Sequence, residues 1–361
     1  MSIEVELRQS IDAVEEEEYQ AFFRASGASF FYDRRFLCAA ERSPLLPVNA
    51  TYYFLARDEG RLVAFLPAYV QAVDSVDPFG LLARTAGIAG DRGQQALFSH
   101  VMHCFDSKVV CVPGTSAPRV VVAALKRLAS DIGVHYVGLL NVAEADALRT
   151  AAGEQLMIRH LVDRYYLDLT RLGSFDELVQ TLPKEGRHEM TRQLRKFDAS
   201  DGTVTVIGPP FDHRLEALTS LCQQTTARNG TPKYFPADAL ARFVRICGDL
   251  ARIVLVEEEG AVVGGLVCFL DRGVFCIWSA GMRYDLAAYS PYTVSFACAY
   301  RWALAHGIET IEAGRLNERI KVRLGLKPLP LYSATSEVVC ATPSLPNEGC
   351  SPGASHGTAS L

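Results

Sequence analysis

Apolar and polar residues follow the same order in two separate parts of the chain. Residues 54–70 read FLARDEGRLVAFLPAYV, and residues 254–270 read VLVEEEGAVVGGLVCFL. Five positions are identical in a gapless alignment of the two segments: Leu55, Glu59, Gly60, Val63 and Leu66 in the first, and Leu255, Glu259, Gly260, Val263 and Leu266 in the second. In each copy a glycine, which can adopt positive φ, follows an acidic residue between two runs that favour β-structure. Each copy is therefore predicted to form a β-hairpin.

A second pair of similar segments comes later in each half. Residues 125–140 read LKRLASDIGVHYVGLL, and residues 299–314 read AYRWALAHGIETIEAG. Both have a helical pattern that stops at a glycine, Gly133 or Gly307, and then a short apolar run typical of a strand. Two matches in the same order predict that one plan of hairpin, helix and strand is present twice.

The repeat divides the chain into two predicted domains. Residues 160–170 (HLVDRYYLDLT) alternate like a strand, and helical segments follow, opened by Ser174 as an N-cap. We therefore predict one domain over residues 1–159 and a second over residues 160–340. Residues 341–361 are rich in Pro, Gly and Ser, and we expect them to form a disordered tail.

Composition and charge fit an ordinary globular protein. The chain has 361 residues, of which 49% are hydrophobic and 21% charged, and its net charge is −5. The charge gives no overall reason for a nucleic-acid or membrane partner, although a local basic surface can lie within an acidic average. The ten cysteines form no CxxC pair, and no apolar run of transmembrane length occurs. A soluble, cytoplasmic protein with free thiols is expected.

Several segments resemble a known family. The basic stretch KEGRHEMTRQLRKF, the hairpin EEEGAVVGG, the segment WSAGMRYDLAAYSPYTV and the closing KVRLGLKPLPLY are similar to the tandem-GNAT proteins of the FemABX type and to GNAT-like acetyltransferases. The resemblance implies an α/β fold with a mixed sheet, in two tandem GNAT-type acyltransferase domains. It also implies amide-bond formation by transfer of an acyl or aminoacyl group to a small-molecule or peptide amine.

The donor of that group is either an acyl-CoA or an aminoacyl-tRNA. In the family's CoA users, a glycine-rich R/Q-x-x-G-x-G/A loop before a helix holds the pyrophosphate. The corresponding segment here, residues 283–292, contains no glycine, although Ser290 suits a helix N-cap and Pro291 a first helical turn. Aminoacyl-tRNA is therefore narrowly favoured. Acyl-CoA is the close alternative, and a non-catalytic binding protein of the same fold is a third.

Two basic stretches are candidates for binding the donor's phosphates. Arg192 and Lys196 are spaced to share a helix face within residues 184–196, and residues 315–327 hold five basic side chains against one acid. We predict that the donor contacts Arg192, Lys196, Arg315, Lys321 and Arg323. The competing interpretation is a solvated helix face and a surface loop.

Candidates for proton transfer come from the C-terminal half. Glu312 alternates with Ile311 on a predicted strand, Asp285 follows the strand FCIWSAGM, and Tyr292 offers a hydroxyl group. These three are the predicted catalytic residues. The plainer alternatives are a solvent-facing strand residue for Glu312 and a turn residue for Asp285.

The acceptor is predicted to bind in a cleft between the domains. Its candidate contacts are His100, Asp106, Trp278 and Tyr284. His100 and His103 are spaced like metal ligands but lack a third well-placed ligand, so no metal site is predicted. The chain has no GxSxG, P-loop, HExxH or Gly-rich dinucleotide motif, so hydrolase, NTPase, zinc-protease and Rossmann functions have no positive signal. No tightly bound cofactor is expected, and the aminoacyl-tRNA or acyl-CoA acts as a co-substrate.

Overall fold

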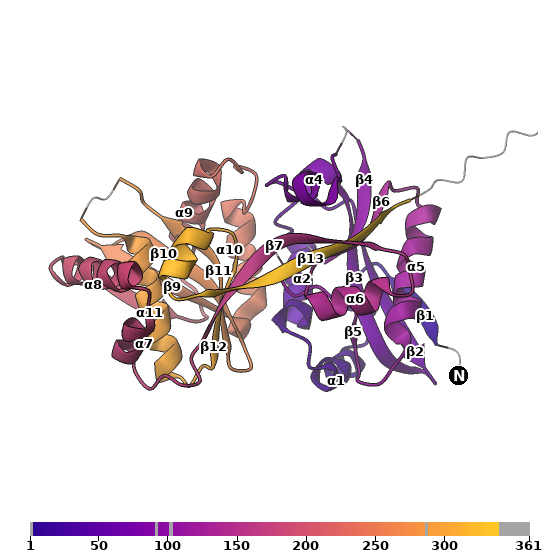
Figure 1. Cartoon of the computed structure of the whole chain (residues 1–361), viewed down its shortest axis with the longest axis horizontal. Coiled ribbons are helices and arrows are strands. Elements are labelled where there is room, and N and C mark those ends of the chain that lie inside the picture. Colours follow the sequence, from indigo (N-terminus) through magenta and orange to yellow (C-terminus); the bar gives the residue numbers. More distant parts are fainter. Residues whose placement is uncertain (1–2, 91–92, 101–103, 286–287, 339–361) are drawn as a thin grey trace, which may run out of the picture.

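The computed structural model describes residues 3–90, 93–100, 104–285 and 288–338 (Figure 1). Its strands form one mixed sheet in the order β1-β2-β3-β4-β6-β13-β7-β12-β11-β10-β9-β8, and β5 pairs with β3. The predicted tail, residues 341–361, lies outside the described residues. The predicted domain boundary at residue 160 falls inside β7.

The N-terminal half ends with α6. Its strands are β1 (Glu4–Arg8), β2 (Ala50–Asp58), β3 (Arg61–Ala72), β4 (Gln95–Ser99), β5 (Val110–Cys111) and β6 (Tyr136–Val142). Its helices are α1 (Glu16–Ser26), α2 (Arg34–Arg42), α3 (Val73–Val76), α4 (Leu81–Ala86), α5 (Ala117–Asp131) and α6 (Glu144–Ala151).

The C-terminal half begins with α7. Its strands are β8 (Thr203–Ile207), β9 (Ala251–Glu258), β10 (Ala261–Asp271), β11 (Val274–Met282) and β12 (Thr310–Arg315). Its helices are α7 (Phe175–Thr181), α8 (Lys184–Asp198), α9 (Arg214–Arg228), α10 (Ala237–Cys247), α11 (Pro291–Ala305) and α12 (Glu318–Arg323). Two long strands, β7 (Met157–Asp168) and β13 (Lys327–Glu337), lie between the halves.

The predicted repeat is present in both halves. The strand order β2-β3-β4-β6 corresponds to β9-β10-β11-β12, and in each set only the last pair is parallel. Both hairpins are confirmed, and each turns on an acidic residue and a glycine that have positive φ, Glu59-Gly60 and Glu259-Gly260. The helix ends at Gly133 and Gly307 are also confirmed, at φ values of 69° and 66°.

The final strands of the two halves are exchanged. β7 follows the N-terminal half in sequence but pairs with β12, whereas β13 follows the C-terminal half but pairs with β6. β7 and β13 also pair with each other, antiparallel, over most of their length. Figure 1 shows these two ribbons crossing from one half to the other. The sheet is therefore continuous because each half supplies the strand that extends the other.

Helices cover both faces of the sheet. In the N-terminal half α5 packs on the face that carries Phe54 and Leu66, and α1 and α2 pack on the face that carries Leu55 and Phe65. In the C-terminal half α11 covers one face, and α9 and α10 cover the other. No helix within the described residues is long and apolar enough to cross a membrane.

One hydrophobic core runs through both halves on the side of α2 and α10. The Phe30 and Phe269 rings stack with centroids 5.0 Å apart, and the Ser43 hydroxyl donates to the Ala239 carbonyl. The Phe30 amide also donates to Asp271, at 2.8 Å. These contacts fix the position of the N-terminal half relative to β10 and β11, beside which the candidate site lies.

Candidate functional site

A cleft opens where two parallel strands separate. β11 and β12 pair only from Val274 and Thr310 to Cys276 and Glu312, although β11 continues to Met282 and β12 to Arg315. The space between them forms a cleft of about 960 Å³. That volume suits a small-molecule or cofactor site. Beyond Cys276 in β11 and Glu312 in β12, the backbone edges of the two strands face the cleft and do not pair with each other.

The cleft is built mainly from the C-terminal half. Its walls come from β11, β12, α8, α9, the start of α11 and the segment from β12 to α12, and the N-terminal half adds Phe79 and Phe105. Three residues around its base have positive φ: Gly314 at 62°, Leu316 at 64° and Asn317 at 57°. Such backbone is costly for leucine, and strain of this kind often accompanies functional sites.

The N-terminus of α11 opens onto one end of the cleft. The Ser290 hydroxyl accepts from the Thr293 amide at 3.3 Å and Pro291 begins the helix, as the sequence predicts. The Ser290 amide donates to Gln193 of α8 at 2.8 Å. Since Pro291 has no N–H and two neighbouring amides already have partners, this helix end has fewer donors for a pyrophosphate than a glycine-rich loop.

Lys321 and Arg315 lie along the base of the cleft. Lys321 is buried, with 4% of its surface exposed, and its Nζ donates to the Arg315 carbonyl at 2.7 Å. Burial and then the neighbouring Arg315 lower the pKa of Lys321 to about 7. The Arg315 guanidinium donates to Asn141 Oδ1 of the N-terminal half at 3.0 Å. Arg315 thus reaches across the boundary between the halves.

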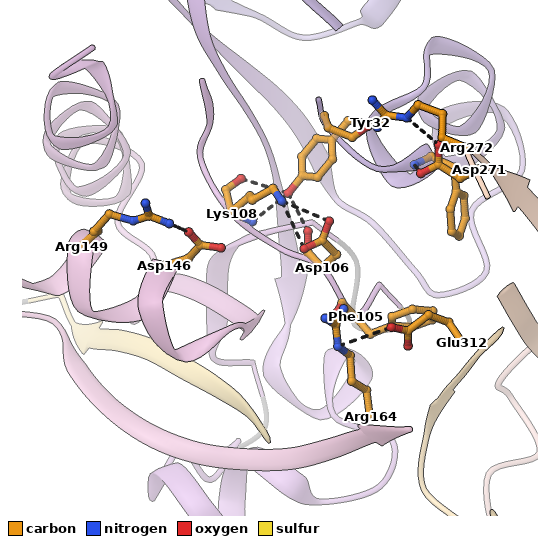
Figure 2. Close-up of polar contacts among 12 residues, drawn as sticks. Tyr32, Phe105, Asp106, Lys108, Asp146, Arg149, Arg164, Asp271, Arg272 and Glu312 are labelled. Carbon is orange, nitrogen blue, oxygen red and sulfur yellow. Dashed lines mark hydrogen bonds and ion pairs between the residues drawn. The ribbon is translucent and has the colours of Figure 1, made fainter. Parts of the chain in front are cut away.

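Glu312 lies beside the cleft with an incompletely satisfied carboxylate. In Figure 2 the Arg164 guanidinium of β7 points toward Phe105 and Glu312, with its Nε 3.9 Å from Glu312 Oε1 and its Nη1 donating to the Phe105 carbonyl. Glu312 Oε2 has no hydrogen-bond partner among the described residues. Burial raises the pKa of Glu312 to about 7, even though Arg164 opposes that change. A carboxyl group in this range suits a general base near neutral pH.

The structure brings six of the predicted site residues into the cleft. These are Trp278, Tyr284, Tyr292, Arg315, Lys321 and Arg323. Burial raises the pKa of Tyr292 well above its usual range, so its hydroxyl stays protonated. Tyr284 lies on the rim, where the Arg228 guanidinium is 4.2 Å from its ring centre. Glu312 does not line the cleft, but Arg164 contacts both Glu312 and the carbonyl of Phe105, and Phe105 is a lining residue.

Three further predicted residues lie on the outer surface. Arg192 and Lys196 are exposed on α8, and Arg192 forms an ion pair with Glu189 at 2.7 Å. Asp285 forms a 2.6 Å ion pair with Arg283, and its side chain is 68% exposed. The hydrogen bond from Arg283 lowers the pKa of Asp285, which makes it a weak proton acceptor. Asp285 is therefore less suited to catalysis than Glu312.

The two acceptor candidates from the N-terminal half do not line the cleft. His100 is buried among aromatic rings with its Nε2 2.7 Å from the Phe31 carbonyl, and burial lowers its pKa to about 4. Asp106 forms an ion pair with Lys108 at 3.4 Å, and its carbonyl accepts from Tyr32 (Figure 2). These partners indicate structural roles, although the charge of Asp106 helps to raise the pKa of Glu312. His103 lies outside the described residues.

Sequence patterns did not single out four residues of the site. Arg164 sits on β7, which has a simple alternating pattern, and Asn141 lies in β6. Phe79 and Tyr234 lie in connecting segments, between α3 and α4 and between α9 and α10. Asn141 has a positive φ of 57°, an unusual backbone conformation that no motif in the sequence predicted. Among the described residues, no group of three His, Cys, Asp or Glu side chains could hold a metal ion.

Comparisons with known proteins agree with this architecture. Residues 184–322 match the family model of the acetyltransferase (GNAT) domain. A search of curated proteins by sequence found no match. Among solved structures, a tandem GNAT protein from the clavulanic acid biosynthesis pathway matches with a TM-score of 0.57 and 11% identity, over 94% of this chain and 100% of its own.

Two other solved structures have the same fold at similarly low identity. L-PGS from Bacillus licheniformis matches with a TM-score of 0.57 and 13% identity, over 89% of this chain and 91% of its own. FemX matches with a TM-score of 0.56 and 9% identity, over 87% and 95% of the two chains. Residues 184–322 therefore match the acetyltransferase (GNAT) domain model, and the chain as a whole shares its fold with the tandem-GNAT structure.

Proposed function

We propose that the protein is an N-acyltransferase that forms an amide bond in the cleft between β11 and β12. The observation that supports this most directly is Glu312, a carboxylate with a raised pKa at the point where the two strands separate. The donor's acyl group enters from the α11 end, and the amine acceptor enters from the boundary with the N-terminal half.

In the proposed step the acceptor nitrogen attacks the donor's carbonyl carbon. A C–N bond forms, and the C–O bond of an aminoacyl ester, or the C–S bond of a thioester, breaks. Glu312 takes the proton that the nitrogen loses, through a water at the Phe105 end of the cleft. Lys321 stabilises the negative charge that develops on the carbonyl oxygen, and the protonated Tyr292 hydroxyl donates to the leaving group.

Aminoacyl-tRNA is the favoured donor. Helix α8 contributes Gly186, Glu189 and Met190 to the cleft, and exposed basic residues lie along the same helix. The ion pairs of Arg192 with Glu189 and of Arg323 with Glu185 are exposed, so exchanging them for phosphates costs little. A tRNA bound along this surface of α8 would place its aminoacylated end at the mouth of the cleft.

Acyl-CoA is the second candidate, favoured by the separated strand edges. Backbone groups that β11 and β12 do not use to pair with each other suit an extended chain that carries amides, as CoA does. The start of α11 argues in the other direction, because few of its first amides remain for a pyrophosphate.

The test is binding followed by turnover. Purified protein is titrated with aminoacyl-tRNA, uncharged tRNA and CoA at several salt concentrations, and acylated amines are then sought by mass spectrometry. An aminoacyl-tRNA user should lose affinity steeply with salt, and Arg195→Ala with Lys196→Ala should reduce the slope by about two. Arg242→Ala on α10, also exposed, serves as the control and should leave the slope unchanged.

Other outcomes distinguish the alternatives. Binding of CoA alone, with no salt-dependent tRNA binding, would replace the preferred donor with acyl-CoA. Ligand binding without an acylated product from any donor would contradict the proposed enzymatic activity and would favour a non-catalytic binding protein.

A further inference from the structure

The end of the cleft at the boundary between the halves is lined by a connected set of aromatic side chains. The Tyr234 ring centroid lies 5.4 Å from that of Phe79 and 4.2 Å from that of Phe235. The Phe235 centroid lies 5.2 Å from that of Trp278. All four residues line the cleft, and we call them the aromatic wall. Trp278 packs in turn on Phe243 and Phe269 of the core, so the wall has a rigid support.

The N-terminal half completes this wall with one residue. Phe79 lies between α3 and α4, in a segment of the N-terminal half whose counterpart in the C-terminal half is the short turn at Arg272-Gly273. It packs edge-to-face on Tyr234, and it is only partly buried. A ligand in this end of the cleft would therefore contact a residue that the C-terminal half alone lacks.

Arg315 lies at the base of the wall without an ion-pair partner among the described residues, although the Asp77 carboxylate is near enough to favour its charge. Its guanidinium contacts Asn141 and the Tyr234 side chain, which are both neutral. Lys108 and Arg164 have acidic partners, Asp106 and Glu312, whereas neither Arg315 nor its neighbour Lys321 forms an ion pair with a described carboxylate. Burial lowers the pKa of Arg315, since desolvation penalises its positive charge. An anion from a ligand would offset that penalty.

We propose that this end of the cleft is the acceptor subsite, and that the acceptor is an amine carrying both a carboxylate and an aromatic or large apolar group, as an aromatic amino acid does. Arg315 binds the carboxylate, and the aromatic wall binds the apolar group. The planar guanidinium matches a carboxylate in a bidentate arrangement. This inference rests on the proposed acyl transfer, and it moves Arg315 from the donor to the acceptor.

The test measures binding without any donor, so that it does not depend on turnover. The chain has two tryptophans, and Trp302→Phe leaves Trp278 of the wall as the sole tryptophan reporter. Fluorescence titrations use L-phenylalanine, 3-phenylpropionate, phenethylamine, L-serine and phenyl phosphate. We expect the first two to bind, and phenethylamine and L-serine to bind at least about ten-fold more weakly, since each lacks one recognised group.

Two variants locate each contact. Arg315→Gln should weaken both carboxylate ligands by about ten-fold and bring L-phenylalanine close to phenethylamine. Phe79→Ala should weaken the aromatic ligands while leaving the melting temperature nearly unchanged, because Phe79 is only partly buried in a connecting segment. Arg242→Gln, exposed on α10, is the matched control and should change neither affinity.

Several results would overturn the proposal. Equal binding of phenethylamine and L-phenylalanine to the unmodified site would remove the carboxylate from the recognised class, even if Arg315→Gln failed to fold. Tighter binding of phenyl phosphate than of 3-phenylpropionate would make the anion a phosphate. Acyl transfer to amines that do not compete with L-phenylalanine would leave the enzyme but place its acceptor elsewhere. Binding as expected with no turnover would instead contradict only the proposed transfer.

Discussion

Arg164 Nε lies 3.9 Å from Glu312 Oε1, within ion-pair distance but without a hydrogen bond. The two residues belong to the neighbouring antiparallel strands β7 and β12. Burial raises the pKa of Glu312 to about 7, and Arg164 is the nearest group that opposes this change. The position of that guanidinium therefore influences the pH at which Glu312 becomes a base.

Replacing Arg164 should move the pH dependence of catalysis upward. For the parent protein, kcat/KM should rise with pH around a midpoint near 7, as Glu312 loses its proton. Arg164→Gln removes the stabilising positive charge, so the midpoint should rise by about one pH unit. Arg159→Gln, on the same strand but exposed, is the control. A midpoint that stays in place in Arg164→Gln would exclude Glu312 as the titrating base.

The same carboxyl group should affect stability. Its pKa is about 7 in the folded protein, above the ordinary 4.5, so the folded state holds the proton more tightly. This preference for the protonated carboxyl group contributes on the order of 1 to 3 kcal/mol to the free energy of unfolding. The contribution is fully present below pH 4.5 and is lost as the pH rises through about 7. Glu312→Gln removes this titration. Relative to the parent protein, the variant should therefore gain that amount of unfolding free energy between pH 4.5 and pH 8.

Urea unfolding at pH 4.5 and at pH 8 measures the difference. Glu309→Gln, an exposed neighbour just before β12, serves as the control and should show no such gain. If Glu312→Gln and the parent protein respond identically to pH, the buried carboxylate is ionised at no cost and the assignment of a base near pH 7 fails.

Gly186 permits the close packing of α8 against the end of α12. A Cβ at this position would lie 1.7 Å from the Arg323 carbonyl oxygen. Helix propensity alone would favour Gly186→Ala by about 1 kcal/mol. Steric overlap with a backbone atom should outweigh that preference, and we expect a destabilisation of about 2 kcal/mol or more with a displaced α8. His188→Ala, exposed on the same helix, should leave the melting temperature nearly unchanged.

Much of the fold follows from local sequence signals. The Glu-Gly turns predicted both hairpins, and Gly133 and Gly307 marked the ends of α5 and α11. Ser174 caps α7 as expected, through a hydrogen bond from the Glu177 amide. Each of these features depends on a few adjacent residues, whose φ preferences or side-chain oxygens act within one turn.

The site was less predictable because its groups come from distant strands. Arg164 and Arg315 are opposite each other in β7 and β12, but 151 positions separate them in sequence, and the register depends on the exchange of β7 and β13. Asn141 and Phe79 reach the site from the N-terminal half. The charge pattern predicted that Arg192 and Lys196 share a helix face, but it did not indicate that this face of α8 points to the outer surface. Distance in sequence, more than residue type, limited the prediction.

The strand exchange predicts that β13 supports both halves. β13 lies between β6 and β7 and pairs with both, and its Leu331 and Ala334 are fully buried. A chain ending at residue 326 would expose the edges of both strands and lose this packing. We therefore expect it to lose amide-exchange protection in β6, far away in sequence from the deletion, as well as in β7.

A chain ending at residue 338 is the matched control, since it keeps all of β13. It should retain the melting temperature and the exchange protection of the full chain. If the shorter chain kept β6 protected while only the C-terminal half opened, the N-terminal half would be stable without the exchanged strand. That result would contradict the role of β13 as a shared element, because a strand required by both halves cannot be removed from one alone.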